Sequence, residues 1–247
     1  APCQLNLSSY AGLTRGASTE LVYTDIRLSN AAPTRLGFDA QSNSEWRGKG
    51  FFPVLNERTP SPEANREGST LYRLLALKQA NPGPTGGPLP DKDFDFSLDR
   101  NQVCTTVEGA DAFARSHPQW GMPYGLPALS RQEHETLAGW IEAGAPYRPL
   151  PAPPAIVATR VEQWERLLNG DALQAQLAAR YIYEHWFIGH LYFDEAPERR
   201  FELVRSRSAP GEPIDVIATR RPYDDPGVAR VYYRLRPTEA TPDRKST

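Results

Sequence analysis

The sequence is poor in sulfur, with two cysteines and one methionine among its 247 residues. Cys3 and Cys104 are isolated and far apart, a pattern that is compatible with one disulfide of the kind that oxidising compartments favour. Such a bond would stabilise the fold by about 4 to 5 kcal/mol, because it would close a long loop. The alternative is that the two thiols are unrelated and buried separately.

The sequence also lacks an excess of charge and a long apolar run. Its formal net charge is −2, and acidic and basic residues are mixed along the chain, which excludes the usual footprint of a nucleic-acid-binding protein. The longest apolar stretch, at 181–193, is interrupted by Glu184, His185 and His190 and is too short to cross a bilayer core of about 30 Å. We therefore expect neither a nucleic-acid partner nor a transmembrane segment.

Apolar residues make up 39% of the chain, which is enough to build globular cores. The densest proline cluster after residue 145 lies at 149–154 and indicates a linker. We expect a first region over 1–148, the linker over 149–154, a second region over 155–237 and a polar, disordered tail over 238–247.

Helical spacing dominates the first region. One helix is predicted over 62–79, and another begins at a capping box formed by Ser130 and Glu133 and ends at Gly144. The faces that would pack on a core carry Leu71, Leu74, Leu75 and Lys78 in the first helix and Leu137, Trp140 and Ile141 in the second.

The second region combines helices with strands. One helix ends at Gly170, and Asp171 caps another that we expect to run to about Phe193, so that the two form a hairpin. Beyond residue 200 the apolar period changes to two, which predicts strands at 201–205, 214–219 and 228–235.

Three strands alone rarely form a stable sheet, so we expect this sheet to be completed by residues past Thr247. The predicted fold class is therefore mainly α in the first region, followed by α+β. The second part would contain the helical hairpin and an incomplete antiparallel three-stranded meander.

Met122, the sole methionine, lies in a loop just before the capped helix. Gly121 and Pro123 would stiffen the backbone there, so that the thioether is presented rather than buried. The segment resembles the part of c-type cytochrome domains that supplies the sixth iron ligand, where a soft sulfur stabilises ferrous haem. We therefore expect the mainly α region over 1–148 to be cytochrome c-like. We predict Met122 as a haem ligand, with Trp120, Pro123 and Tyr124 beside the cofactor. The alternative is a methionine that fills a gap in the core.

Covalent haem attachment needs a C-x-x-C-H segment, and none occurs in the 247 residues. As it stands, this chain cannot attach a c-type haem. We expect either that the attachment segment lies upstream of Ala1 or that the domain has lost its cofactor.

Five phrases of the sequence are long and peculiar enough to be specific: APCQLNLSSY at 1–10, FPVLNER at 52–58, FDFSLDR at 94–100, RYIYEH at 180–185 and RRPYDDPG at 220–227. They resemble the bacterial fatty acid cis/trans isomerases. The resemblance implies a periplasmic enzyme with haem c, whose C-x-x-C-H segment precedes Ala1 and whose chain extends past Thr247. The sequence would then be a fragment that, alone, shows no haem absorbance and no isomerase activity.

The resemblance also implies the reaction and its partners. Double bonds of membrane unsaturated fatty acids, free or in phospholipids, would be converted from cis to trans during membrane stress adaptation. An isolated alkene offers no carbonyl that could accept charge from a nucleophile, which disfavours covalent catalysis. A redox metal that transiently withdraws an electron would weaken the π bond and allow rotation.

The second predicted helix of the hairpin has an aromatic face. Tyr183, Phe187 and His190 are candidates for lining an acyl-chain slot, although such stripes are usually core. His185 and His190 would lie about 140° apart on a helix, which disfavours a shared metal ion.

Two further functions stay open. An electron-transfer c-type cytochrome would share the Met122 loop but would not need the second region. A haem-free lipid-binding or structural module would account for the missing attachment segment.

Overall fold

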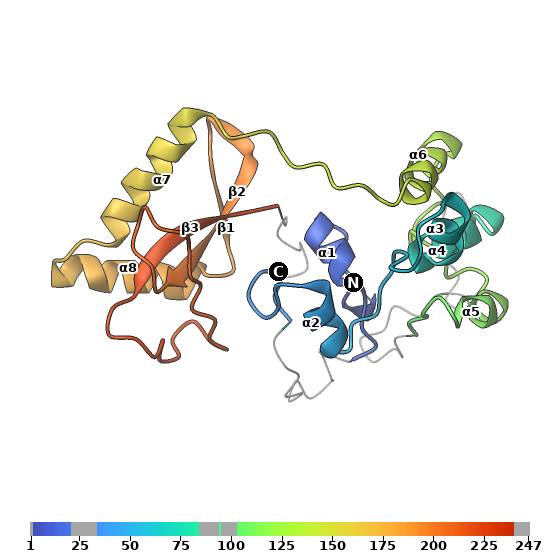
Figure 1. Ribbon diagram of the computed structural model, residues 1–247, viewed down its shortest axis with the longest axis horizontal. Helices are drawn as coiled ribbons and strands as arrows, with labels where there is room; N and C mark the ends of the chain where they lie inside the picture. The colour runs from blue at the N-terminus through green and yellow to red at the C-terminus, as the bar shows by residue number, and fades with distance from the viewer. Residues whose placement is uncertain (1, 21–33, 84–93, 95–102, 240–247) are drawn as a thin grey trace. The chain divides into compact units, whose positions relative to one another are not determined.

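The computed structural model describes residues 2–20, 34–83, 94 and 103–239, which form two compact units (Figure 1). The first unit comprises the described residues of 1–32 and 40–148, and the second comprises those of 33–39 and 149–247. The predicted tail lies outside the described residues from residue 240 onward.

The first unit is built from short helices. Five of them follow a serine whose side chain accepts a hydrogen bond from a backbone N–H of the first turn, so that these helix starts are satisfied locally. The elements are a 3-10 turn Pro2–Gln4, α1 Tyr10–Arg15, α2 Asn43–Gly48, α3 Pro62–Glu67, α4 Thr70–Ala80, α5 Ala110–Ser116 and α6 Arg131–Glu142.

The prediction of one helix over 62–79 is wrong, because the chain breaks between α3 and α4. Gly68 ends α3, and Ser69 then caps α4 by accepting a hydrogen bond from the Tyr72 N–H at 3.1 Å. The same hydroxyl donates to the carbonyl oxygen of Val54 at 2.9 Å. A serine that bonds nearby backbone in this way competes with helix continuation.

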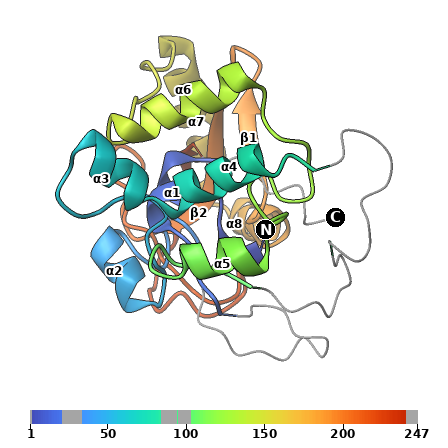
Figure 2. The ribbon, with the colours of Figure 1, turned by 90° about the vertical axis from the view of Figure 1, so that its right-hand side faces the viewer.

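α4 contacts α3, α5 and α6, and Figure 2 shows it between α5 and α6. The capping box that was predicted for α6 is confirmed. Ser130 Oγ accepts from the Glu133 N–H at 3.3 Å, and Glu133 Oε2 accepts from the Ser130 N–H at 2.9 Å. A small core of Leu13, Ala17 and Val54 joins α1 to the segment that follows α2.

A disulfide joins Cys3 and Cys104, the two cysteines of the sequence. Their Cα atoms are 5.8 Å apart, in the usual range for such a bond, and 101 residues separate them along the chain. The bond ties the first turn of the chain to the segment that leads into α5.

The second unit packs two helices against a three-stranded antiparallel sheet with the strand order β1-β2-β3 (Figure 1). The elements are α7 Ala155–Leu168, α8 Leu173–Trp186, β1 His190–Phe193, β2 Ala196–Ser206 and β3 Tyr232–Thr238. The core between helices and sheet consists of Val157, Leu168, Ala179, Tyr183, Ala196, Phe201, Leu203 and Leu235. Across the described ranges, none of the helices is both long and apolar enough to span a membrane.

The helical hairpin is present, but its second helix ends earlier than predicted. α8 stops at Trp186. The residues from 187 to Phe193 were predicted as helix, but 187–189 form a turn and His190–Phe193 form β1. Gly189 lies in the turn, and His190 then pairs with Glu202 of β2 in antiparallel register. The backbone hydrogen bonds of β2 therefore outweigh the helical spacing of the aromatic residues.

Of the three predicted strands, the first and the third match β2 and β3, although β3 begins later and ends at Thr238. The strand predicted at 214–219 was wrong, since in the described part of the chain this segment makes an isolated bridge between Val216 and Ser206. The Ser206 hydroxyl accepts the Asp215 N–H at 3.1 Å, so side chains replace part of the ladder here.

A buried ion pair fixes α7 against the edge strand β3. Glu165 is 4% exposed and accepts hydrogen bonds from Arg234 Nε at 2.8 Å and from the Leu235 N–H at 2.9 Å. The Arg234 guanidinium also donates to the carbonyl oxygens of Ala209 at 2.5 Å and Glu212 at 3.1 Å. The Glu165 carboxylate thus accepts a backbone N–H at the edge of the sheet and also balances the charge of a buried arginine.

A segment from early in the chain packs with the second unit, which the sequence did not predict. Arg236 Nη1 donates to the Gly37 carbonyl at 2.6 Å, and its guanidinium lies 4.1 Å from the centre of the Phe38 ring. Arg35 Nη1 donates to the Thr219 carbonyl at 2.9 Å. Residues 34–39 therefore form part of this unit's surface layer.

Replacing Glu165 with Ala should lower the free energy of unfolding of the second unit by about 3 to 5 kcal/mol, because a buried Arg234 loses its counter-charge. Glu162→Ala, on an exposed position of the same helix, is the matched control and should change it by about 0.5 kcal/mol or less. Denaturant unfolding monitored by circular dichroism measures both, and equal effects would contradict the role given to Glu165.

Candidate functional site

The main apolar cavity described in the first unit has a volume of about 510 Å³. It lies among the N-terminal segment, α1, α4, the loop before α6, and α6 itself. Its walls are almost entirely hydrocarbon, with two serines and a tyrosine at one side. The lining residues are Leu7, Ser8, Ser9, Tyr10, Leu13, Leu71, Leu75, Met122, Pro123, Leu129, Leu137, Trp140 and Ile141.

Met122 is half-buried and borders this cavity. Its position is set by the backbone, because the Met122 N–H donates to the Leu74 carbonyl of α4 at 2.9 Å. Gly121 lies directly against α4, where an added Cβ atom would come within 2.4 Å of the Lys78 backbone nitrogen. The absence of a side chain at Gly121 is what allows the loop to dock this closely.

The mouth of the cavity exposes apolar side chains to solvent. Leu7 is 50% exposed and Leu137 is 39% exposed, although both line the cavity. Trp140 is fixed across the wall by a hydrogen bond from its Nε1–H to the Pro146 carbonyl at 3.1 Å. The cavity is therefore an open apolar site whose rim a bound ligand would bury.

Only two of the four residues predicted beside a cofactor line this cavity. Met122 and Pro123 do, whereas Trp120 and Tyr124 pack against each other with ring centres 5.5 Å apart. Tyr124 also meets Phe94, at 5.7 Å between ring centres. These two aromatic residues support the loop and do not wall the cavity.

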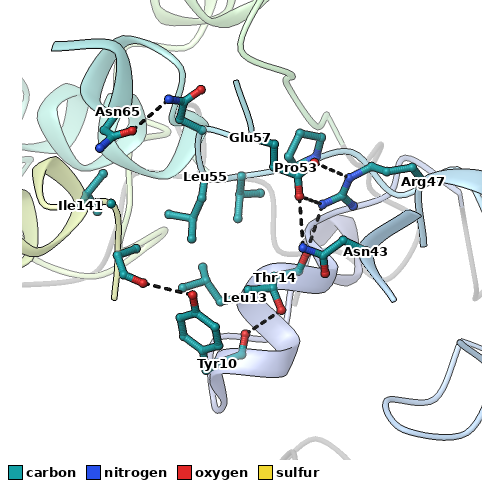
Figure 3. Close-up of a pocket in the computed structure, with 14 residues that line it drawn as sticks. Tyr10, Leu13, Thr14, Asn43, Arg47, Pro53, Leu55, Glu57, Asn65 and Ile141 are labelled. Atoms are coloured by element: carbon teal, nitrogen blue, oxygen red, sulfur yellow. Dashed lines mark hydrogen bonds and ion pairs between the residues drawn. The ribbon is translucent and has the colours of Figure 1, made fainter. Parts of the chain in front are cut away.

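A second, smaller cavity of about 140 Å³ shares Tyr10, Leu13 and Ile141 with the first (Figure 3). Its polar groups bond one another. The Tyr10 hydroxyl donates to the Ala145 carbonyl at 3.1 Å, and Arg47 pairs with Glu57 at 2.6 Å. Because these polar groups bond one another, we interpret the smaller cavity as part of the internal packing of the unit and not as a ligand site.

The acyl-slot candidates lie in the second unit and do not line either cavity. Tyr183 is 7% exposed within the core, Phe187 packs against that core, and burial raises the pKa of Tyr183. His190 lies on β1, where its Nε2 is 3.2 Å from Glu202 Oε1. The geometry gives these residues packing contacts, and an acyl slot there stays a prediction.

The histidines do not form a metal centre. Within the described ranges, no three His, Cys, Asp or Glu side chains gather closely enough to hold an ion. His185 Nδ1 lies 2.7 Å from the Tyr181 carbonyl oxygen on α8, whereas His190 belongs to β1. The helical angle from which their separation was predicted does not apply, because the two residues lie on different elements.

The residues around the larger cavity fit one side of a haem. Met122 offers a soft sulfur, and the surrounding leucines offer apolar walls of the kind that ligand pockets share. Cys3 and Cys104 are joined to each other, so neither is available to attach a porphyrin. The described lining contains no histidine.

Sequence reasoning found Met122 and the α6 face but missed the N-terminal wall. Leu7 and Leu13 approach the cavity because the chain start folds onto α4 and α6, a long-range contact that no local pattern predicts. The spacing of Leu71 and Leu75 did give a signal, since it predicted a packed face.

Replacing Gly121 with Ala should destabilise the first unit by about 1 to 3 kcal/mol, because the new methyl group has no space against the α4 backbone. Gly139→Ala on α6 is the matched control, since nothing lies within 4 Å of its Cβ position, and it should be neutral or stabilising. Thermal unfolding of both variants checks this, and an unchanged midpoint for Gly121→Ala would show that the loop does not dock as described.

The comparisons with known proteins agree with the resemblance in the sequence. A family model described as Fatty acid cis/trans isomerase (CTI) matches residues 31–247, which include Met122 and the whole second unit. Searches of the curated proteins and of the solved structures gave no match. Because the family match covers most of its length, the chain belongs to the fatty acid cis/trans isomerase family.

Proposed function

We propose that this chain forms one side of the haem site of a fatty acid cis/trans isomerase, in which Met122 would supply a sulfur ligand to the iron. The observation that carries the proposal is that Met122 lines an open, apolar cavity of about 510 Å³. That volume is in the usual range for cofactor and ligand sites, about 300 to 1,000 Å³. The first unit would then act as a cytochrome c-like part of the enzyme.

The residues of this chain have three tasks under the proposal. Met122 presents sulfur from a docked loop, and Pro123 and Trp140 form apolar walls beside it. The half-exposed Leu7 and Leu137 would be covered by the bound group, which excludes water from the site. Low polarity strengthens the electrostatic effects of whatever charge develops there.

A haem bound in this cavity would supply reversible one-electron chemistry, which suits an alkene that offers no carbonyl to a nucleophile. The substrates under the proposal are unsaturated fatty acids or phospholipid acyl chains, which the apolar rim suits.

The attachment cysteines would have to come from outside these 247 residues, since both cysteines of the chain are in the disulfide. We propose the periplasm as the compartment. The Cys3–Cys104 bond supports this, because disulfides persist in oxidising compartments.

A second candidate is a haem-free lipid-binding module. The hydrocarbon lining of the same cavity favours it, since an acyl chain would also be held by leucine and tryptophan walls. Under this alternative Met122 would be one apolar contact among many.

In a haem-loaded protein that includes the attachment segment, Met122→Ala should abolish the absorbance that arises from sulfur bound to ferric iron and should lower the reduction potential, because the thioether stabilises ferrous haem. Isomerase activity should fall by tenfold or more. Absorbance spectra, potentiometric titration and turnover of a cis fatty acid provide the three measurements.

Leu126→Ala is the matched control, because Leu126 lies in the same loop and is 61% exposed. It should leave the spectrum and the potential at their wild-type values. A Met122→Ala protein with an unchanged spectrum would refute the ligand assignment, and retained acyl-chain binding by protein without haem would favour the lipid-binding alternative.

A further inference from the structure

Lys78 is a buried cation beneath the loop that carries Met122. Its side chain lies on α4 and the residue is 2% exposed. Nζ donates to the Gln119 carbonyl at 3.3 Å and lies 5.7 Å from the centre of the Phe94 ring. Among the described residues, no carboxylate lies within ion-pair distance of this ammonium group.

Placing an ammonium group in this environment is unfavourable. Burial lowers the pKa of Lys78, which reflects the loss of water around the charged form. A leucine or methionine would fill the same space at no such cost. The position is therefore explained by what the ammonium group contacts: its hydrogen-bond partner is the Gln119 carbonyl in the backbone of the Met122 loop, and the Phe94 ring lies beside it.

α4 holds this loop at three points. The Leu74 carbonyl accepts the Met122 N–H at 2.9 Å, Lys78 Nζ reaches Gln119 at 3.3 Å, and Gln79 Nε2 donates to the Leu129 carbonyl at 2.9 Å. The contacts through Lys78 and Gln79 lie on opposite sides of Met122 in the sequence. The Lys78 contact is made to Gln119, three residues before Met122, by a side chain that is buried on α4.

We infer that Lys78 is a positioning residue for Met122: its ammonium group tethers the Gln119 carbonyl to α4 and so fixes the direction in which the thioether enters the cavity. The inference rests on the proposed function, because direction matters for a sulfur that must reach an iron atom. A thioether that merely filled a core would tolerate a looser loop.

The test uses the haem-loaded protein that includes the attachment segment, and the variant Lys78→Met, which keeps an unbranched side chain of similar length and removes the donor. A hydrogen bond to a charged group shifts an equilibrium by about tenfold or more. We therefore expect most of the sulfur-to-iron absorbance to be lost and the reduction potential to move toward that of Met122→Ala. Lys78→Gln, which keeps a donor, should retain more of the absorbance than Lys78→Met.

Lys49→Met is the matched control, because Lys49 lies at the end of α2 and is not part of the cavity. It should keep the wild-type spectrum and potential. Circular dichroism reports folding. If Lys78→Met fails to fold, the absorbance of Lys78→Gln is compared with that of the wild type: partial retention supports the inference, and complete loss overturns it.

A folded Lys78→Met protein with wild-type absorbance and potential would overturn the inference, as would a folded Lys78→Gln protein that loses as much as Lys78→Met. Failure of the proposed function gives a different result, since Met122→Ala would then leave the spectrum unchanged whatever Lys78 does.

Discussion

The first unit depends on the close approach of a loop backbone to a helix backbone. Gly121 touches α4 where a methyl group would not fit, and the adjacent Met122 N–H bonds the Leu74 carbonyl. This contact places Met122 at one wall of the cavity. α6 and the N-terminal segment complete the walls.

The second unit depends on a different constraint, the buried carboxylate of Glu165. Its two oxygens bond a guanidinium and a strand N–H, which ties α7 to β3, and the Arg234 guanidinium in turn donates to the Ala209 carbonyl. The helical face of the sheet is filled with apolar residues, whereas the other contacts of the unit are made largely by arginines to backbone carbonyls. Such hydrogen bonds fix the positions of segments that do not pair with a strand of the sheet.

The sequence predicted those features that local patterns encode. The capping box at Ser130 places α6, alternation places β2, and the bracketed methionine marks the cavity wall. The break at Ser69 was missed because both sides of it keep apolar spacing, while a hydroxyl bond to the distant Val54 ends the helix.

Other features could not be predicted because they depend on contacts between residues far apart in the chain. Strand β1 exists because β2 offers a pairing edge, and aromatic residues at 190–193 suit a helix or a strand equally. Leu7 reaches the cavity through a fold that brings the chain start to α4 and α6. The family was evident from long phrases of the sequence, whereas the arrangement of the residues around the cavity became clear only from the structure.

The solitary thioether has a consequence for oxidative chemistry. Since the chain contains one methionine and it is half-buried at an open cavity, sulfoxide can form at one position only. Addition of a single oxygen would make that side chain polar and a poor partner for a soft metal. Peroxide would thus oxidise a single thioether within these 247 residues, and methionine sulfoxide reductase chemistry would reverse the change.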